Sequence, residues 1–348
     1  MGHQVDLLTM GFGKLPAEAE VDGVRVHRVP CGRRQAYHCT MLETAAYLMA
    51  ASAWVRRRLK VERYDLIHAH FIFPDGILAW RAHQAAGLPY VITAHGSDVA
   101  GYNLYRLQWA HKLLAPLWRR VVGSAAAIIC PSSMLQNLVH LQSVAAKTRV
   151  IPNGIDAVSF PTSSDPRHKK ILVVTRILER KGIQYLIQAL KGFPHDWAVH
   201  IVGDGPYLPS LKVAAERQGV AVKFEGWMES GSVALKELYE TSQIFVLPSE
   251  AENFPVVLLE AMAAGLAIIT TKETGCAEVV ADAGILIPAK DAAAIKAALE
   301  QLIENPNRCQ ALGQAARRRL EEQFSWPSVA QRYVAIYQQA IDSGISTR

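Results

Sequence analysis

The sequence predicts an α/β protein in which two Rossmann-like domains, each built on a parallel sheet, face a cleft. Two observations lead to this prediction. Short apolar segments alternate with longer helix-like segments in both halves of the 348-residue chain, an order typical of parallel sheets covered by helices. Several apolar segments also run straight into polar turns, as strands do where open α/β sheets bind ligands. With 50% hydrophobic residues, the chain can bury the cores of two domains.

The charge of the chain is unevenly distributed. The net charge is +6, of which residues 1–157 carry +7 and residues 158–348 carry −1. The arginines of the basic half lie in separate places without interleaved aromatic residues, so we expect no nucleic-acid partner. A membrane surface with anionic headgroups stays open as a partner of this basic domain.

The cysteine and hydropathy patterns bear on the compartment. The five cysteines show neither Cys-x-x-Cys nor Cys/His spacing, which argues against a disulfide framework or a zinc site and fits a reducing cytoplasm. The longest uncharged apolar stretch, residues 45–55, is too short to span a bilayer. We therefore expect a cytoplasmic protein, either soluble or peripheral at the inner face of the membrane.

The first half reads as strands separated by helices. Residues 47–60 form a helix, and the arginines near its end suit the negative end of the helix dipole. Residues 104–122 mix apolar and basic side chains, and two interpretations stay open: a membrane-facing amphipathic surface, or a helix packed on the sheet with snorkelling arginines. Segments with an apolar or alternating strand pattern are residues 2–9, 24–29, 65–70, 88–94, 126–130 and 148–151.

The second half repeats this alternation after a polar, proline-bearing segment. Residues 158–168 have the composition of a linker. They separate residues 1–157 from residues 169–325 as two domains, and residues 326–348 form a terminal helix. Strands of the second domain are expected at residues 171–175, 198–202, 244–247 and 268–271.

A pair of carboxylates marks the turn after residues 244–247. Glu252 lies just before a helix that ends at Gly265, and Glu260 lies within that helix. Eight residues at about 1.5 Å each place the two carboxylates roughly 12 Å apart. The helix N-terminus between them could receive a diphosphate, so the span would fit a nucleotide sugar held at both ends. The plain alternative is an amphipathic helix with solvated glutamates.

The segment around this pair resembles a known donor-site signature. Glu252, Glu260 and the following Ala-Met-Ala-Ala-Gly are similar to the signature of glycosyltransferase family 4, the group 1 retaining enzymes with GT-B architecture. The resemblance implies that Arg176 and Lys181 hold the diphosphate, that Glu252 binds the donor sugar and that Glu260 binds the ribose. The other donor-binding residues that it implies are Gly203, Asn253, Phe254 and Val256.

The resemblance continues through most of the chain. His95-Gly96 resembles the family's His-Gly, which implies that His95 lies beside the reacting carbon of the sugar and acts in catalysis with Arg176, Lys181 and Glu252. On the acceptor side it points to His70 and Asp98. The terminal helix resembles the one by which the family's chain returns to brace the first domain. No Asp-x-Asp motif occurs, so we expect no metal, and no cofactor beyond a nucleoside diphosphate sugar as co-substrate.

One departure from the family concerns the first domain. Family members have a strand, a glycine-rich loop and a helix ahead of the segment that corresponds to residues 2–9. We therefore expect a first domain that is truncated at its start, with an unpaired position in its sheet. Unpaired backbone groups on two neighbouring strands are costly, so this polypeptide alone is expected to be compromised in stability or activity.

The resemblance implies a metal-independent hexosyltransferase. Its reaction would move a sugar, with retention of configuration, from a nucleoside diphosphate sugar to a glycan or lipid-linked acceptor, in cell-surface polysaccharide or glycolipid biosynthesis. Two alternatives stay open: a GT-B nucleotide-sugar epimerase or phosphorylase, and a sugar-nucleotide-binding protein without turnover. The sequence leaves the base, the donor sugar and the acceptor undetermined.

Overall fold

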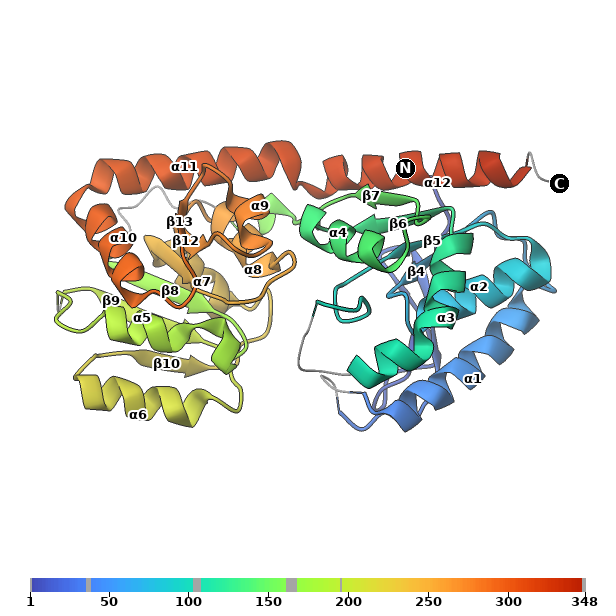
Figure 1. Ribbon diagram of the computed structural model, residues 1–348, viewed down its shortest axis with the longest axis horizontal. Coiled ribbons are helices and arrows are strands. Elements are labelled where there is room, and N and C mark those ends of the chain that lie inside the picture. The colour runs from blue at the N-terminus through green and yellow to red at the C-terminus, as the bar shows by residue number, and fades with distance from the viewer. Residues whose placement is uncertain (1, 36–38, 103–107, 161–167, 195, 346–348) are drawn as a thin grey trace. The chain divides into compact units, whose positions relative to one another are not determined.

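The computed structural model describes residues 2–35, 39–102, 108–160, 168–194 and 196–345. The chain forms two compact α/β units (Figure 1). The first unit comprises Met1–Cys130, Leu135–Arg149 and Val334–Arg348, and the second comprises Pro131–Met134 and Val150–Tyr333. The linker expected at residues 158–168 falls largely on residues 161–167, which lie outside the described ranges. The expected domain limits therefore stay predictions.

The first unit begins with a small mixed sheet. Its strands are β1 (Asp6–Met10), β2 (Glu18–Val21) and β3 (Val24–Val29), in the order β1-β3-β2. β1 runs parallel to β3, whereas β2 pairs antiparallel with it. The β2–β3 hairpin turns through Asp22 and Gly23, both with positive φ, as a two-residue Asp-Gly turn requires. The strand expected at residues 24–29 is confirmed, and the one expected at residues 2–9 lies at Asp6–Met10.

A second sheet of the first unit contains β4 (Ile67–His70), β5 (Tyr90–Thr93), β6 (Ala127–Cys130) and β7 (Thr148–Val150), in that order. β4, β5 and β6 are parallel. The helices between these strands are α1 (Met41–Arg58), α2 (Asp75–Ala86), α3 (Gln108–Ser124) and α4 (Ser133–Gln142).

The first helix corrects the expectation for residues 47–60. α1 starts at Met41, because Thr40 caps it in a reciprocal box with Glu43. The threonine side chain accepts from the Glu43 N–H, and the glutamate carboxylate accepts from the Thr40 N–H at 2.7 Å. The amphipathic segment expected at residues 104–122 is covered in part by α3, whereas residues 103–107 lie outside the described residues.

The two sheets of the first unit are not joined in the described part of the chain. β1 ends one sheet and β4 ends the other. A single sheet with an unpaired position had been expected here, whereas the described residues form two separate sheets.

The second unit is organised around one six-stranded parallel sheet. Its order is β10-β9-β8-β11-β12-β13, a doubly wound arrangement. The strands are β8 (Lys170–Val174), β9 (Ala198–Val202), β10 (Lys223–Gly226), β11 (Ile244–Leu247), β12 (Ala267–Thr271) and β13 (Ile285–Ile287). Residues of β8 alternate between two buried clusters: Ile171 and Val173 contribute to one, and Leu172 and Val174 to the other. The sheet is therefore covered on both faces.

Helices of the second unit fill both faces of this sheet. Short 3-10 turns lie at Ala157–Ser159 and Glu179–Lys181. The α-helices are α5 (Ile183–Ala189), α6 (Leu208–Gln218), α7 (Val233–Thr241), α8 (Val256–Ala263), α9 (Cys276–Val280), α10 (Ala292–Glu304), α11 (Pro306–Gln323) and α12 (Trp326–Ile345). α12 belongs to the second unit up to Tyr333 and to the first unit from Val334.

Candidate functional site

The candidate donor site lies at the switch point of the second sheet. β8 and β11 are neighbours in the sheet, but the chain leaves β8 toward β9 on one side and leaves β11 toward β12 on the other. The loops that follow two such strands diverge and leave room at their carboxyl ends, where ligands of open α/β sheets bind. Residues 175–182 and 248–255 form these loops, and they carry most of the predicted donor residues.

Close backbone contacts hold the two loops together. The Glu250 N–H donates to the Arg180 carbonyl at 2.8 Å. Gly182 adopts φ +71, and a Cβ at this position would lie 2.0 Å from the Pro248 carbonyl oxygen. Only glycine fits this approach. Behind the second loop, the Thr271 hydroxyl donates to the Ser249 carbonyl at 2.7 Å, which anchors the loop to β12.

Lys181 and Glu252 form an ion pair across these loops. Lys181 Nζ donates to Glu252 Oε1, and the two side chains are only 10% and 12% exposed. The sequence assigned the lysine to phosphate and the glutamate to the sugar. In the structure each is the partner of the other, which keeps two little-hydrated charges neutralised.

Two further predicted donor-binding residues, Arg176 and Gly203, follow the neighbouring strands β8 and β9. Arg176 directly follows Thr175 after β8, and its side chain is exposed. Gly203 lies at the end of β9 with φ +136, and a Cβ there would lie 1.9 Å from the Thr175 carbonyl oxygen. This glycine therefore allows the turn after β9 to approach the loop that carries Arg176.

Glu260 is a buried carboxylate in the middle of α8. It is 7% exposed, and its Oε2 accepts a hydrogen bond of 2.7 Å from the Tyr239 hydroxyl. Its Oε1 lies 3.5 Å from the Ser230 hydroxyl. Burial raises the pKa of Glu260, although the hydrogen bonds from Tyr239 and Ser230 oppose this shift. One oxygen is thus firmly held, whereas the other makes only a long contact.

The residues between the two glutamates have structural partners of their own. Asn253 is buried and its Oδ1 accepts from the Ser132 hydroxyl at 2.6 Å. The Phe254 ring is buried and packs edge-on against Phe324, with 5.5 Å between ring centroids. Val256, 44% exposed, is the first residue of α8, and Pro255 before it is the N-cap residue.

The loop after β12 and the short helix α9 contact the donor loop and the start of α4. Gly275 precedes α9, and its N–H donates to the Glu252 carbonyl at 3.0 Å. Glu278 of α9 accepts from the N–H groups of Ser133 and Met134, at 2.7 and 3.0 Å. Its carboxylate thereby satisfies unpaired donors at the start of α4.

A histidine cluster in the first unit contains the expected His95. His95 follows β5, and His70 ends β4. His70 Nδ1 lies 3.1 Å from His95 Nε2, and the two rings are stacked. His68 contacts the Thr93 hydroxyl through Nε2 and the Tyr337 hydroxyl through Nδ1, both at 2.8 Å.

Burial keeps these imidazoles neutral. It lowers the pKa of His95, and burial together with the proximity of His95 lowers the pKa of His70. The pKa of His68 falls to about 3, mainly through burial. At neutral pH one nitrogen of the His70–His95 contact donates and the other accepts. His95 is therefore an uncharged imidazole that can face positive charge without repelling it.

Asp98, expected on the acceptor side, is a buried carboxylate between two loops of the first unit. It is 5% exposed. Its Oδ1 accepts from the His95 N–H at 3.0 Å and its Oδ2 from the Ile72 N–H at 2.7 Å. The carboxylate thus ties the loops after β4 and β5 together. Burial raises the pKa of Asp98.

Several site residues were missed by the sequence analysis. Tyr239, the partner of Glu260, lies 21 residues upstream in α7, and no motif links the two. Ser132, the partner of Asn253, lies 121 residues away. Their contacts arise from tertiary packing, which leaves no local pattern. In the described residues, no group of three or more His, Cys, Asp or Glu side chains could hold a metal ion, and no described helix is long and apolar enough to cross a membrane.

Two family models together match most of the chain. The model described as "Glycosyltransferase Family 4" matches residues 1–158, and the model described as "Glycosyl transferases group 1" matches residues 155–319. The chain belongs to the family 4 glycosyltransferases of group 1. It is a glycosyltransferase of the hexosyltransferase type expected from the sequence.

Relatives of this glycosyltransferase share both sequence and fold. The alpha-maltose-1-phosphate synthase of Mycolicibacterium smegmatis is 28% identical, over 90% of this chain and 90% of that protein. Sucrose-phosphate synthase from Thermosynechococcus elongatus matches with a TM-score of 0.85 and 23% identity, over 98% of this chain and 90% of that chain. Anabaena HepE in complex with UDP-glucose matches with a TM-score of 0.71 and 19% identity, over 99% of this chain and 100% of that chain.

The fold of the glycosyltransferase is GT-B, as expected. The expected truncation of its first domain is not evident from these comparisons, which span nine-tenths or more of each relative.

Proposed function

We propose that this glycosyltransferase moves a sugar from a nucleoside diphosphate sugar to a glycan or lipid-linked acceptor, with retention of anomeric configuration. The observation that carries the proposal is the set of charges at the switch point of the second sheet. Lys181, Glu252 and Glu260 lie on or after the loops that follow β8 and β11. Such a set offers a cation for phosphates and carboxylates for hydroxyl groups.

Glu260 is assigned to the ribose of the donor. Its Oε2 is fixed by Tyr239, while its Oε1 has only the 3.5 Å contact with Ser230. A ribose hydroxyl that donates to Oε1 would replace this long contact with a charge-assisted hydrogen bond. Because the buried carboxylate lacks hydration when it is ionised, a hydrogen bond from the ribose would stabilise it more than it would stabilise an exposed carboxylate.

Lys181 and Glu252 are assigned to an exchange of partners on donor binding. A diphosphate is a stronger partner for the Lys181 ammonium group than a single carboxylate, because it carries more negative charge. Once Lys181 turns to the diphosphate, Glu252 becomes free to accept hydrogen bonds from the sugar hydroxyls. Arg176, exposed beside Thr175, adds the planar guanidinium that suits phosphate oxygens. Together the two cations would stabilise the charge of the departing diphosphate.

His95 is assigned to the reacting carbon of the sugar. Its neutral imidazole, oriented by His70 and by the Asp98 contact to its backbone, suits a group that faces positive charge developing at the anomeric carbon. His70 and Asp98 then support His95 on the acceptor side. We propose that the reaction needs no metal ion, because cationic side chains meet the leaving diphosphate.

The reaction can be tested with a panel of donors and acceptors. UDP-, GDP- and ADP-linked hexoses would be incubated with hexose phosphates, chosen because of the two sugar-phosphate synthases among the relatives, and with lipid-linked sugar phosphates. NMR of the anomeric proton would show transfer with retention. Interconversion of the donor without acceptor would instead favour an epimerase, dependence on free phosphate a phosphorylase, and binding without product a sugar-nucleotide-binding protein.

We also propose a cytoplasmic location with contact to the inner membrane surface, in assembly of cell-surface polysaccharide or glycolipid. The +7 charge of residues 1–157 supports this. Sedimentation with anionic vesicles, but not with neutral vesicles, is the expected result. If the protein sediments with neither kind of vesicle, the membrane surface is removed from the proposal.

A further inference from the structure

Helix α1 is apolar on both of its sides. On the inner side, Tyr47 and Ala51 are buried in a cluster with Val29 of β3 and Leu78 of α2. The helix lies beside α2 in the first unit (Figure 1). A helix that the fold covers on one side usually carries polar residues on the opposite side. The outer side of α1 departs from this rule.

The outer side carries exposed apolar residues along most of the helix. They recur every three or four residues, as residues on one side of a helix do, and form what we call the outer row: Leu42, Ala45, Met49 and Ala53. All are exposed, and Leu42 and Met49 are 84% and 70% exposed. Single exposed apolar residues are ordinary on protein surfaces, whereas contiguous patches of them indicate interaction sites.

Exposed basic residues continue the outer row at the end of α1. We call them the basic cluster: Arg56, Arg57, Lys60 and Arg63. None of the four forms an ion pair with a carboxylate among the described residues. Arg56 lies in line with the outer row, because it follows Ala53 by three residues. Even with the exposed Asp65 that follows, the segment keeps an excess of positive charge.

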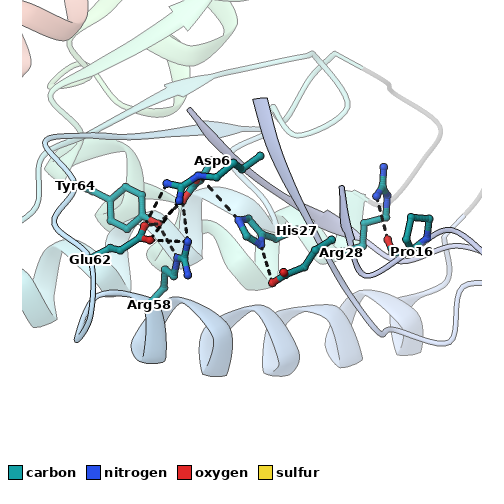
Figure 2. A network of polar contacts seen from close by, with 9 residues as sticks. Asp6, Pro16, His27, Arg28, Arg58, Glu62 and Tyr64 are labelled. Carbon is teal, nitrogen blue, oxygen red and sulfur yellow. Dashed lines mark hydrogen bonds and ion pairs between the residues drawn. The ribbon is translucent and has the colours of Figure 1, made fainter. Parts of the chain in front are cut away.

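Figure 2 shows that the acidic residues nearby are engaged with other arginines. Asp6 pairs with Arg25 at 2.6 Å, and Glu62 pairs with Arg58 at 2.7 Å. Tyr64 donates a further hydrogen bond to Asp6 at 2.5 Å. Two carboxylates thus meet two arginines, so this network is balanced in charge. The basic cluster stays available to anions from outside the chain.

We infer, on the basis of the proposed function and its membrane contact, that the outer row and the basic cluster of α1 form the surface by which this glycosyltransferase binds a bilayer with anionic lipids. The outer row enters the boundary between headgroups and acyl chains, about 5–10 Å deep. The basic cluster contacts lipid phosphates at one end of the row. A helix that lies in the plane of the interface satisfies both parts of this surface at once.

Charge distinguishes a bilayer from a second copy of the chain as the occupant. The carboxylate of α1, Glu43, already accepts hydrogen bonds from Thr40 in the capping box. A second copy that paired through its own outer row would therefore cover the apolar residues but offer the basic cluster no anionic partner from α1. A bilayer with anionic lipids covers the row and neutralises the cluster. Each Lys or Arg near such a surface should strengthen binding about five-fold.

Sedimentation of the whole chain with vesicles tests the basic cluster. Vesicles of phosphatidylcholine alone are compared with vesicles that also contain phosphatidylglycerol. Arg56→Gln together with Arg57→Gln should weaken binding to the anionic vesicles about 25-fold, since each lost charge contributes about five-fold. Arg119→Gln with Arg120→Gln is the matched control: it removes the same charge from two exposed positions of α3 and should weaken binding far less.

The outer row is tested by a loss and by a gain of binding. Leu42→Ser with Met49→Ser should abolish most binding, whereas the control Leu141→Ser with Val144→Ser should bind as the parent does. The control residues are 78% and 92% exposed but lie outside α1. Met49→Trp should strengthen binding several-fold, because the indole ring favours the membrane interface. A misfolded variant would not produce this gain.

Equal losses in the α1 and α3 charge variants would overturn the inference, as would serine variants of Leu42 and Met49 that bind as the parent does, or weaker binding of Met49→Trp. A lipid-free dimer that these serine substitutions dissociate would assign the outer row to a second copy instead. Sugar transfer to a water-soluble acceptor should be the same in all variants. Failure of the proposed reaction would therefore appear separately, as a lack of transfer in the parent chain.

Discussion

Lys181 and Glu252 neutralise each other where water reaches little of either side chain (10% and 12% exposed). Removing one partner leaves an uncompensated charge, so Lys181→Met should lower the free energy of unfolding by about 3 kcal/mol. The double variant Lys181→Met with Glu252→Gln should recover most of this loss, because no lone charge remains. Denaturant unfolding of the two single variants and the double variant measures the coupling.

The double variant should recover stability but not turnover. The double variant lacks both the phosphate cation and the sugar carboxylate, so it should stay inactive. A double variant that regains sugar transfer would show that the pair serves only the fold and would remove it from the proposed donor site.

Glu260 allows stability and binding to be separated. Glu260→Gln keeps an acceptor for Tyr239 but removes a carboxylate whose pKa is raised by burial. Because burial disfavours the ionised carboxylate of Glu260 at neutral pH, the glutamine variant should be at least as stable as the parent. Its affinity for UDP or another matching nucleoside diphosphate should fall about ten- to a hundred-fold, since hydrogen bonds to charged groups contribute about 1.5–3 kcal/mol.

Tyr239→Phe is the matched control for this variant. It leaves the Glu260 carboxylate buried without its 2.7 Å donor, so stability should fall by about 1–3 kcal/mol. Calorimetric titration and chemical unfolding of both variants give the comparison. Unchanged nucleotide affinity in Glu260→Gln would place the ribose elsewhere.

Asp75 should make the stability of the first unit depend on pH. Burial raises its pKa from 3.8 to about 6, although it accepts a 2.6 Å hydrogen bond from Tyr47. Because the folded-state pKa is the higher one, the stabilising contribution is present below about pH 4 and is lost as the pH rises through about 6. Over this pH range the free energy of unfolding falls by at most about 3 kcal/mol. Asp75→Asn should remove this dependence, which unfolding of both proteins between about pH 4 and pH 7 would show; identical profiles would contradict it.

At the scale of elements, the site depends on loops that approach one another closely. A Cβ at Gly203 would lie 1.9 Å from the Thr175 carbonyl oxygen, at a φ of +136. Gly203→Ala should therefore cost more than about 2 kcal/mol and slow turnover, because the turn after β9 must move away from the Arg176 loop. Gly219→Ala is the control: its φ is +65, but nothing lies within 4 Å of the added Cβ, so only the strain of about 1 kcal/mol applies. Equal losses in the two variants would show that the close approach is unimportant.

The elements themselves were largely predictable, because apolar runs such as residues 244–247 and 171–175 reflect burial on both faces of a parallel sheet. The start of α1 was recoverable from Thr40 and Glu43, whose capping box is a local signal. The hairpin of β2 and β3 was missed despite Asp22-Gly23, because the exposed residues of β2 lack an apolar pattern.

The site was predictable only where it is local in sequence. Glu252 lies in the loop after β11 and Glu260 lies in α8, and this order of strand, loop and helix is as expected. The pairing of Glu252 with Lys181 was not foreseen, because it spans 71 residues and depends on the order of strands in the sheet. His95 was recognised from its neighbour Gly96, but its neutral state follows from burial that the sequence does not display.

At the scale of the whole molecule, the last part of α12 should control the stability of the first unit alone. Residues 334–345 belong to that unit, where Ile336 and Ala340 are buried and Tyr337 bonds to His68 at 2.8 Å. Deletion of residues 334–348 removes this packing, and each large buried side chain contributes about 1.5–3 kcal/mol. We expect calorimetry to show a lower melting temperature for the first unit and an unchanged transition for the second. Tyr337→Phe, which keeps the ring but not the hydroxyl, should cost only about 1 kcal/mol. If the deletion lowered both melting temperatures equally, the two units would unfold together. The α12 residues after Tyr333 would then stabilise the second unit as well.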